Sequence, residues 1–425
     1  MHFLYNLSIQ FLRAALWAAS CFNPKAKKWV LGRRNWKTVL LQKLQVSAGQ
    51  KTLWMHVSSL GEFEQGRPVI EQFRSEFPTW RIVLTFFSPS GYEVRKDYPL
   101  ADVVAYLPAD TPGNARNFLD LLQPDAAIFV KYDFWANYLF QLKKCNTPTL
   151  LVSALFRPSQ PFFKWYGGLW REMLGCFNHI FVQNEASAAL LHALLPAEKG
   201  ESSRISVAGD TRVDRVLRLA AEVKPNPIVA AFAGKETVLV VGSSWEADEN
   251  LLFSVLQMPA FQYFKVIIAP HEPSERNVTR ICRQYGNALR YSNLATGDPV
   301  NARVLVIDNI GLLNTLYRYG SIAYIGGGLG NGIHNTLEPA AFGLPIIFGP
   351  KYEKFEEARE FVARGGAFSV QNSNDSAAVL AQLQQPETYD KASQAVRRFL
   401  TERGGATEKA MLWLRNQVHN QKIQG

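Results

Sequence analysis

Cysteine is scarce in this sequence, and the few that are present form no pattern. The 425 residues include four widely separated cysteines: Cys21, Cys145, Cys176 and Cys282. None stands in a C-x-x-C pair, the arrangement typical of zinc sites and redox motifs. The scarcity therefore argues against a zinc site and a disulfide framework, and it fits a protein of a reducing compartment.

The sequence also lacks the usual signatures of nucleic-acid and dinucleotide binding. It has no zinc-finger spacing and no aromatic-basic strand motif of the RNA-recognition type. Its most glycine-rich segment, residues 326–332, does not have the G-x-G-x-x-G spacing of a dinucleotide site. A formal net charge of +10 favours an anionic partner. Without those signatures, a nucleotide or an acidic membrane is favoured over nucleic acid.

Length and composition predict a globular protein with two domains. The chain is 47% hydrophobic and 19% charged, and it has no low-complexity tract. Such a composition supplies enough apolar surface for a folded core. A chain of 425 residues is too long for one ordinary core, so we expect two domains.

The N-terminal segment is apolar but not uniformly so. Arg13 is the only charge in residues 3–22, and polar or amphipathic side chains recur at helical spacing: Asn6, Gln10, Arg13, Trp17 and Ser20. A basic stretch with Trp29 and Trp36 follows: Lys25, Lys27, Lys28, Arg33, Arg34 and Lys37. This pattern predicts an amphipathic helix on the surface of an anionic bilayer. A first helix packed on the protein itself and a single membrane span are the alternatives.

The rest of the chain alternates strand and helix patterns. A first series of strands is expected at 52–57, 82–86, 103–106, 126–130, 149–152, 180–183 and 206–208. A second series is expected at 238–241, 265–269, 304–307, 322–325 and 346–348. This rhythm predicts an α/β fold with two doubly wound, Rossmann-like halves, divided near residues 209–230. Ligands of such sheets lie beyond the carboxyl ends of the strands, so we expect a cleft between the halves.

The glycine-rich segment Gly326–Gly332 joins the expected strand at 322–325 to a helical pattern that begins near Asn335. Glycines at such a turn allow backbone N–H groups to approach a phosphate. Asn335 and Glu338 have the spacing of a helix-capping pair, and the same two side chains could hydrogen-bond a ribose. A tight turn followed by a capped helix is the alternative.

Other candidate site residues follow the first strands of each half. Glu62 comes at about the start of the helix predicted over 63–77, where the helix dipole is expected to lower its pKa and keep it ionised. It is either a general base or a carboxylate that stabilises the helix start. Ser90 lies in a second strand-to-helix turn that could hold a phosphate or carboxylate. Ser243 and Ser244 lie in a possible anion-binding loop, and His271 could contact a phosphate or cap a helix.

These segments together resemble the 3-deoxy-D-manno-octulosonic acid (Kdo) transferases of lipopolysaccharide assembly, which have the GT-B glycosyltransferase fold. The resemblance extends over nearly the whole chain and depends on the order of its motifs: residues 56–62, 85–91, 134–137, 183–185, 209–214, 242–249, 271, 308–313, 326–339 and 349–350 with Phe355. It implies two Rossmann-like domains facing a cleft, with an N-terminal membrane-associated helix. The expected domains are residues 1–37 (helix and basic flank), 38–215 (acceptor domain) and 216–425 (nucleotide-sugar domain).

The resemblance also implies an activity and assigns residues to it. The reaction is transfer of Kdo from CMP-Kdo to the 6′-hydroxyl of a lipid A precursor at the cytoplasmic face of the inner membrane, without a metal or other cofactor. Glu62 corresponds to the base, and Asn335 and Glu338 to the residues that hold the ribose. The amides of Gly326, Gly327 and Gly328, with His271, lie near the phosphate, and Ser243 and Ser244 belong to the donor loop.

This chain departs from the family at several positions that could contact the donor or acceptor. Lys131 and Asp133 stand where the family often has glutamates, and Arg157 follows a stretch that usually contains an arginine. Ser90 and Arg212 are further candidate contacts within shared motifs. Two other functions remain open from the residues alone: a UDP-sugar epimerase of the same fold, and a non-catalytic, membrane-attached nucleotide-binding protein.

Overall fold

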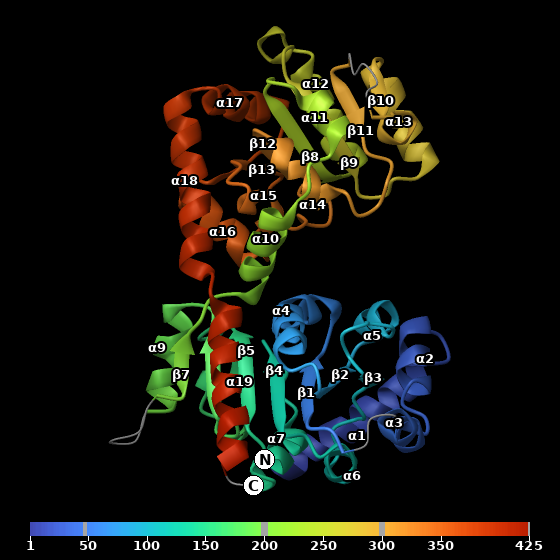
Figure 1. Ribbon diagram of the computed structural model, residues 1–425, viewed down its shortest axis with the longest axis vertical. Helices are drawn as coiled ribbons and strands as arrows, with labels where there is room; N and C mark the ends of the chain where they lie inside the picture. The colour runs from blue at the N-terminus through green and yellow to red at the C-terminus, as the bar shows by residue number, and fades with distance from the viewer. Residues whose placement is uncertain (46–48, 197–202, 297–301, 424–425) are drawn as a thin grey trace. The chain divides into compact units, whose positions relative to one another are not determined.

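The computed structural model describes residues 1–45, 49–196, 203–296 and 302–423. The chain forms two compact units (Figure 1): Met1–Asp214 with Arg403–Gly425, and Arg215–Glu402. The chain passes between the units within α10 (Thr211–Glu222) and at the end of α18 (Pro386–Arg403).

The first unit contains a parallel sheet with strand order β3-β2-β1-β4-β5-β6-β7. Its strands are β1 (Thr52–Val57), β2 (Arg81–Phe86), β3 (Val103–Tyr106), β4 (Ala126–Val130), β5 (Thr149–Ala154), β6 (His179–Val182) and β7 (Ile205–Val207). Every residue of β1, β2, β4 and β5 is buried, because helices cover both faces of the sheet. This burial explains why the strands are nearly continuous apolar runs in the sequence.

Helices of the first unit flank this sheet (Figure 1). They are α1 (His2–Ala19), α2 (Pro24–Leu31), α3 (Trp36–Gln45), α4 (Leu60–Glu76), α5 (Pro89–Arg95), α6 (Pro112–Leu122), α7 (Ala136–Lys144), α8 (Gly168–Leu174), α9 (Glu185–Leu194) and α19 (Ala406–Ile423), with a 3₁₀ turn η1 (Pro161–Phe163). Proline at the first position of α2, α5 and α6 fits a helix start, where no intrahelical partner exists for its missing N–H.

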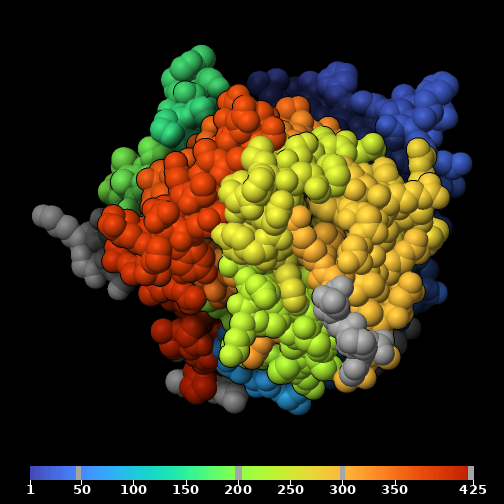
Figure 2. Space-filling model, turned by 90° about the horizontal axis from the view of Figure 1, so that it is seen from above, coloured from blue at the N-terminus to red at the C-terminus, as the bar shows by residue number. Residues whose placement is uncertain are grey.

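The second unit contains another parallel sheet, with strand order β10-β11-β9-β8-β12-β13-β14. Its strands are β8 (Val238–Ser244), β9 (Lys265–Pro270), β10 (Ala288–Arg290), β11 (Val304–Val306), β12 (Ile322–Ile325), β13 (Ile346–Phe348) and β14 (Ala367–Ser369). Its other elements are α11 (Pro227–Ala233), α12 (Glu246–Leu256), η2 (Pro259–Phe261), α13 (Glu275–Tyr285), η3 (Tyr291–Asn293), α14 (Leu313–Leu316), η4 (Tyr317–Tyr319), α15 (Leu337–Ala341), α16 (Glu356–Ala363) and α17 (Ser373–Leu383). Helices α12 and α17 lie side by side on its surface (Figure 2).

The α/β fold with two doubly wound sheets is confirmed, but two strands and one domain boundary differ from expectation. The short strands β10 and β14, at the two edges of the second sheet, were not predicted. Residues 216–425 do not form one domain, because residues 403–425 belong to the first unit. The cause is packing: α19 buries Ala410, Met411 and Leu414 in the same apolar cluster as Phe63 and Phe73 of α4.

Helix α1 packs on the first unit through only one side. Tyr5 donates a hydrogen bond to Asp110 over 2.5 Å, and the side chains of Asn6 and Asn137 are hydrogen-bonded over 2.9 Å. Ile9 is buried, whereas Phe3, Leu4 and Phe11 on α1 are 76%, 65% and 68% exposed. None of the described helices is long and apolar enough to cross a membrane.

Candidate active site

The first part of the site is built at the carboxyl edge of the first sheet, where β1 and β2 end. The backbone N–H of Ser88 donates to the carbonyl oxygen of Ser58 over 2.7 Å, so the two loops lie together. Helix α4 begins at Leu60, two residues earlier than expected, and Ser59 is its N-cap. Glu62 Oε2 accepts hydrogen bonds from the backbone N–H (2.9 Å) and hydroxyl (3.2 Å) of Ser59. This capping box fixes the position of the Glu62 carboxylate.

The expected effect of the helix dipole on Glu62 is wrong. Burial raises the pKa of Glu62, although hydrogen bonds from Ser58 and Ser59 and the charge of Lys131 act in the opposite direction. Removing part of the water around a carboxylate disfavours its charged form, and here this effect exceeds the stabilisation by the helix start. A carboxylate with a raised pKa is a stronger base once it is ionised.

Asp133, which follows β4, is a buried carboxyl group in the same cluster. It is 3% exposed and accepts a hydrogen bond from the Ser58 hydroxyl. Burial and the neighbouring Glu62 carboxylate raise the pKa of Asp133 well above its ordinary value. Burial therefore raises the pKa of both carboxyl groups, and the Glu62 charge adds to the effect on Asp133.

His56, the next-to-last residue of β1, is buried beside Asp133. Its ring is fully buried, and Nδ1 is 2.9 Å from the Thr85 hydroxyl oxygen. Burial lowers the pKa of His56 to about 3, so the ring is neutral at physiological pH. Its Nε2 atom is 4.0 Å from Asp133 Oδ1. In the sequence, His56 stands out only as part of a motif, and its proximity to Asp133 was not predictable, because no local spacing connects residue 56 with residue 133.

The other candidate contacts of the first unit have different surroundings. Lys131 adopts a left-handed backbone conformation (φ 60°), and its charge opposes the rise in the pKa of Glu62; Arg212, and to a smaller extent Lys131, lowers the pKa of Asp210. Arg212 is paired with Asp210 at 2.7 Å. The hydroxyl oxygens of Ser90 and Ser88 are 2.8 Å apart, and Arg157 is exposed. The structure therefore places Lys131 and Asp133 in the electrostatic surroundings of Glu62, whereas Arg212 is committed to an ion pair.

The second unit has a candidate site of its own, a cavity of about 350 Å³. Its lining includes Ser243, Asn314, Tyr317, His334, Asn335 and Glu338. Asn335 donates from Nδ2 to Glu338 Oε1 over 2.9 Å, and its Oδ1 accepts from the backbone N–H of Leu337 over 3.0 Å. The two side chains are therefore joined at the start of α15 and line the cavity. The N-cap of α15 is Thr336, so Asn335 and Glu338 are not the expected capping pair, and their contact with a ribose stays a prediction.

The glycine-rich turn differs from the expected phosphate cradle. The N–H of Gly326 donates to the Gly242 carbonyl oxygen (2.9 Å), and that of Gly327 donates to Asp248 Oδ2 (2.9 Å). Two of the three expected phosphate donors are thus used within the protein. The glycines are required by close backbone approach: a Cβ at Gly326 would lie 2.3 Å from the Ser243 carbonyl oxygen, and one at Gly328 would lie 2.5 Å from the Gly349 nitrogen.

Two buried acidic residues hold this region together. Asp248 accepts hydrogen bonds from Trp245 N–H (2.9 Å) and from the Tyr324 hydroxyl (3.0 Å), in addition to Gly327. Glu249 accepts from the Ser244 hydroxyl over 2.7 Å, so this hydroxyl is directed into the protein. Ser243 is different, because it lines the cavity with a left-handed backbone (φ 52°). Of the two serines, Ser243 is the one available to a ligand.

Three aromatic rings are stacked beside the cavity. The ring centroids of Trp245 and His271 are 4.6 Å apart, and those of His271 and His334 are 4.4 Å apart. Burial and the neighbouring His271 lower the pKa of His334. The stack places His271 next to the nucleotide-sized cavity without lining it. His334 lines the cavity and was not singled out from the sequence.

The chain resembles known proteins over most of its length. A family model described as 3-deoxy-D-manno-octulosonic-acid transferase (kdotransferase) matches residues 34–215. The 3-deoxy-D-manno-octulosonic acid transferase of Aquifex aeolicus is 27% identical over 78% of this chain and 85% of its own length. The protein of the same name from Chlamydia pneumoniae is 26% identical over 77% of this chain and 76% of its own length.

The fold is shared more widely than the family. The crystal structure of a UDP-GlcNAc 2-epimerase from Neisseria meningitidis superimposes with a TM-score of 0.58 over 86% of this chain and 100% of that chain, at 17% identity. Such a low identity shows a common fold alone.

Two parallel, doubly wound sheets, one in each unit, are the features of the GT-B fold. The matching family model and the named relatives support the 3-deoxy-D-manno-octulosonic acid (Kdo) transferase family and a glycosyltransferase enzyme, as the sequence predicted. They favour this enzyme over the epimerase and the non-catalytic nucleotide-binding protein.

Proposed function

We propose that this enzyme transfers Kdo from CMP-Kdo to a hydroxyl group of a lipid A precursor of the lipid IVA type, in lipopolysaccharide synthesis. Kdo transfer itself is supported by the family and by the names of the relatives. The observation that carries the mechanism is the carboxyl pair of the first unit, in which Asp133 is fully buried and Glu62 is held by the capping box.

In this mechanism, Glu62 is the general base. It takes the proton of the acceptor hydroxyl as that oxygen attacks the anomeric carbon of Kdo, with inversion. The raised pKa of Glu62 increases its basicity, and the hydrogen bonds of Ser58 and Ser59 and the charge of Lys131 limit this rise. Asp133 does not compete for this role, because burial and the charge of Glu62 keep it protonated. The leaving CMP is a stable anion, so the bond breaks without a strong acid.

The cavity of the second unit is the proposed site of the cytidine nucleotide. Asn335 and Glu338 present a joined amide and carboxylate, which can together accept and donate hydrogen bonds to ribose hydroxyls. The phosphate is expected near Ser243, His271 and the amide of Gly328. Gly326 and Gly327 are left out of this set, because their amides are bonded within the protein.

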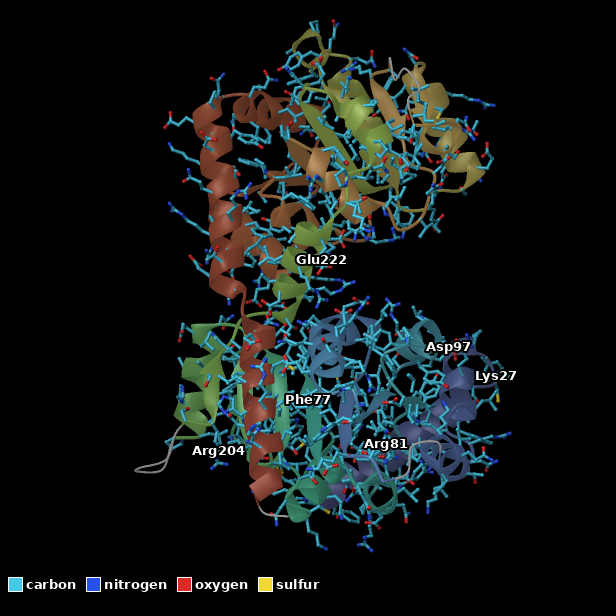
Figure 3. The ribbon with its side chains drawn as sticks, viewed as in Figure 1. Lys27, Phe77, Arg81, Asp97, Arg204 and Glu222 are labelled. Carbon is cyan, nitrogen blue, oxygen red and sulfur yellow. The ribbon has the colours of Figure 1, made fainter. Side chains whose placement is uncertain are left out.

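The acceptor is a lipid, so we further propose that the enzyme works at the cytoplasmic face of the inner membrane. The exposed apolar side chains of α1 and the exposed lysines of α2 support attachment to an anionic bilayer. Lys27 projects outward from the first unit (Figure 3). Arg33 is an exception to the expected basic flank, because its guanidinium is bonded to the backbone carbonyls of Leu107, Trp29 and Phe87.

The reaction can be tested with purified protein, CMP-Kdo and a lipid A precursor, with the product identified by mass spectrometry. We expect a product heavier than the acceptor by Kdo units and the release of CMP. Acceptor returned unchanged while CMP-Kdo binds to the protein would exclude the proposed acceptor. The same assay with UDP-GlcNAc in place of CMP-Kdo is the control for donor choice, and no product is expected.

A further inference from the structure

The first unit contains a second cavity, which none of the proposed catalytic or donor-binding residues lines. Its volume is about 530 Å³, and it lies between α1, α2 and the segment that follows β3. Volumes of about 300–1,000 Å³ are typical of small-molecule sites. The part of the chain matched by the family model begins at residue 34, so α1 and α2 precede it.

The walls of this cavity are cationic and aromatic. They include three arginines and three tryptophans: Arg13, Arg33, Arg34, Trp17, Trp29 and Trp36. No aspartate or glutamate is among the described residues that line it. The cavity thus has the charge that an anionic ligand requires, together with flat apolar walls.

Arg33 forms a rigid part of this wall. Its guanidinium donates to the carbonyl oxygens of Leu107 (2.8 Å) and Phe87 (2.7 Å), and it lies 3.9 Å from the centroid of the Trp29 ring. Burial lowers the pKa of Arg33 to about 9, so it remains charged at neutral pH. Within the described ranges no carboxylate is paired with it. Its nitrogens are bonded to backbone carbonyls, including that of Trp29 (3.1 Å), so Arg33 supplies a fixed, partly desolvated positive charge at the cavity wall.

Three further donors lie in the same region. Arg13 is exposed, with a hydrogen bond to Gln10 over 2.8 Å, and Arg34 is exposed. The indole N–H of Trp29 is buried and has no acceptor among the described atoms. Guanidinium groups bind phosphate oxygens through paired hydrogen bonds, which makes phosphate the best match for this set.

An apolar surface adjoins the cationic cavity. Gln10 and Ala14 line the cavity from α1, and Phe3, Leu7 and Phe11, within about two helical turns of Gln10, are 76%, 41% and 68% exposed. A free phosphate or a nucleotide would not use this apolar face. A phosphate that carries acyl chains would use both surfaces at once.

We propose that this cavity binds the phosphodiester head group of an anionic glycerophospholipid of the membrane, with the acyl chains against the exposed face of α1. The tryptophans suit this position, because their rings are apolar and their N–H groups are polar. The inference rests on the proposed membrane attachment, but not on the proposed transfer reaction. A head-group site would make membrane attachment specific for one class of lipid, whereas general charge attraction would not distinguish among anionic lipids.

The test uses the full-length protein and short-chain phosphatidylglycerol below its micelle concentration, with binding followed by calorimetry. Arg13→Gln/Arg34→Gln removes two cavity cations and retains Arg33, which packs in the protein. Lys96→Gln/Lys144→Gln is the matched control, because it removes the same charge from exposed positions that do not line the cavity. We expect saturable binding to the parent and the control, and a loss of about tenfold or more in the arginine variant.

Several outcomes would overturn the proposal. If both double variants bound phosphatidylglycerol equally weakly, the binding would depend on general charge attraction and not on this cavity. Binding of sn-glycerol 3-phosphate as tight as that of phosphatidylglycerol would mean a site for free phosphate. If the arginine variant bound phosphatidylglycerol normally and instead had a higher KM for acceptor dispersed in detergent, the cavity would belong to the acceptor. Unchanged lipid binding in the arginine variant, with loss of vesicle binding in Phe3→Gln/Phe11→Gln, would refute the head-group site and leave membrane attachment intact.

Discussion

Burial and the neighbouring carboxylate of Glu62 hold the pKa of Asp133 well above its ordinary value. The two residues follow different strands, β1 and β4, which are adjacent in the sheet. Their pairing gives two chemically alike acids different surroundings: Asp133 is the more deeply buried, and its pKa is raised further by the Glu62 charge. The Ser58 hydroxyl, which donates to Asp133, connects the loop of Glu62 with this buried acid.

The first prediction concerns Asp133 and the pH dependence of stability. A carboxyl whose pKa is raised in the folded state contributes full stability below its unfolded pKa, and that contribution is lost as the pH rises through the folded pKa. The melting temperature of the parent should therefore fall as the pH rises above about 4. Asp133→Asn keeps the shape of the neutral acid, so its melting temperature should fall less over the same range.

The measurement is thermal unfolding between pH 4 and 8, with the exposed Asp120→Asn as the control. Glu62 has a pKa shift of the same sign, so some pH dependence should remain in Asp133→Asn. If the melting temperatures of the parent and of Asp133→Asn changed with pH in parallel, Asp133 would be ionised in the folded protein.

The second prediction concerns the nucleotide cavity. Glu338→Ala removes a carboxylate that lines the cavity and holds the Asn335 amide. A hydrogen bond to a charged group contributes roughly 1.5–3 kcal/mol, so CMP should bind about ten to a hundred times more weakly. Calorimetric titration with CMP checks this, and the exposed Glu353→Ala is the control. If CMP bound Glu338→Ala as tightly as the parent, Glu338 would serve only to orient the start of α15.

The third prediction concerns the exposed face of α1. Phe3→Gln/Phe11→Gln removes two exposed apolar side chains and preserves the contacts of Tyr5 and Ile9 with the protein. Each buried apolar side chain is worth roughly 1.5–3 kcal/mol, so binding to anionic vesicles should fall by about a hundredfold or more. Activity on a detergent-dispersed acceptor should change little.

Vesicle co-sedimentation provides the measurement for this third prediction. Val94→Gln/Leu412→Gln, in which two comparably exposed apolar residues are changed, is the control. Co-sedimentation of both variants equal to that of the parent would show that α1 is simply a packed helix of the first unit.

The sequence predicted the sheets well because their strands are buried on both faces. Strands β1, β3, β4, β12 and β13 begin and end at the expected residues, since an apolar run bounded by polar turns leaves little ambiguity. The return of α19 to the first unit could not be predicted in the same way. An amphipathic pattern indicates that a helix buries one face, but it does not identify the surface against which that face packs.

The electrostatics of the site depended on contacts that sequence spacing does not reveal. The position of Glu62 at a helix start was predictable, but the burial that reverses its pKa shift is set by tertiary packing. The same is true of Gly327, whose amide is bonded to Asp248, a residue 79 positions away in the chain. The general-base role of Glu62 and the ribose contacts of Asn335 and Glu338 stay predictions.

The most direct test of the account is the transfer rate of Glu62→Gln on CMP-Kdo and a lipid A precursor. Glutamine retains the capping interaction with Ser59 but cannot take a proton, so the turnover number should fall by roughly 10²–10⁴. The melting temperature and CMP affinity should remain those of the parent, and Glu64→Gln, on the same helix, should stay active. Turnover of Glu62→Gln within a few-fold of the parent would contradict the assignment of Glu62 as the base.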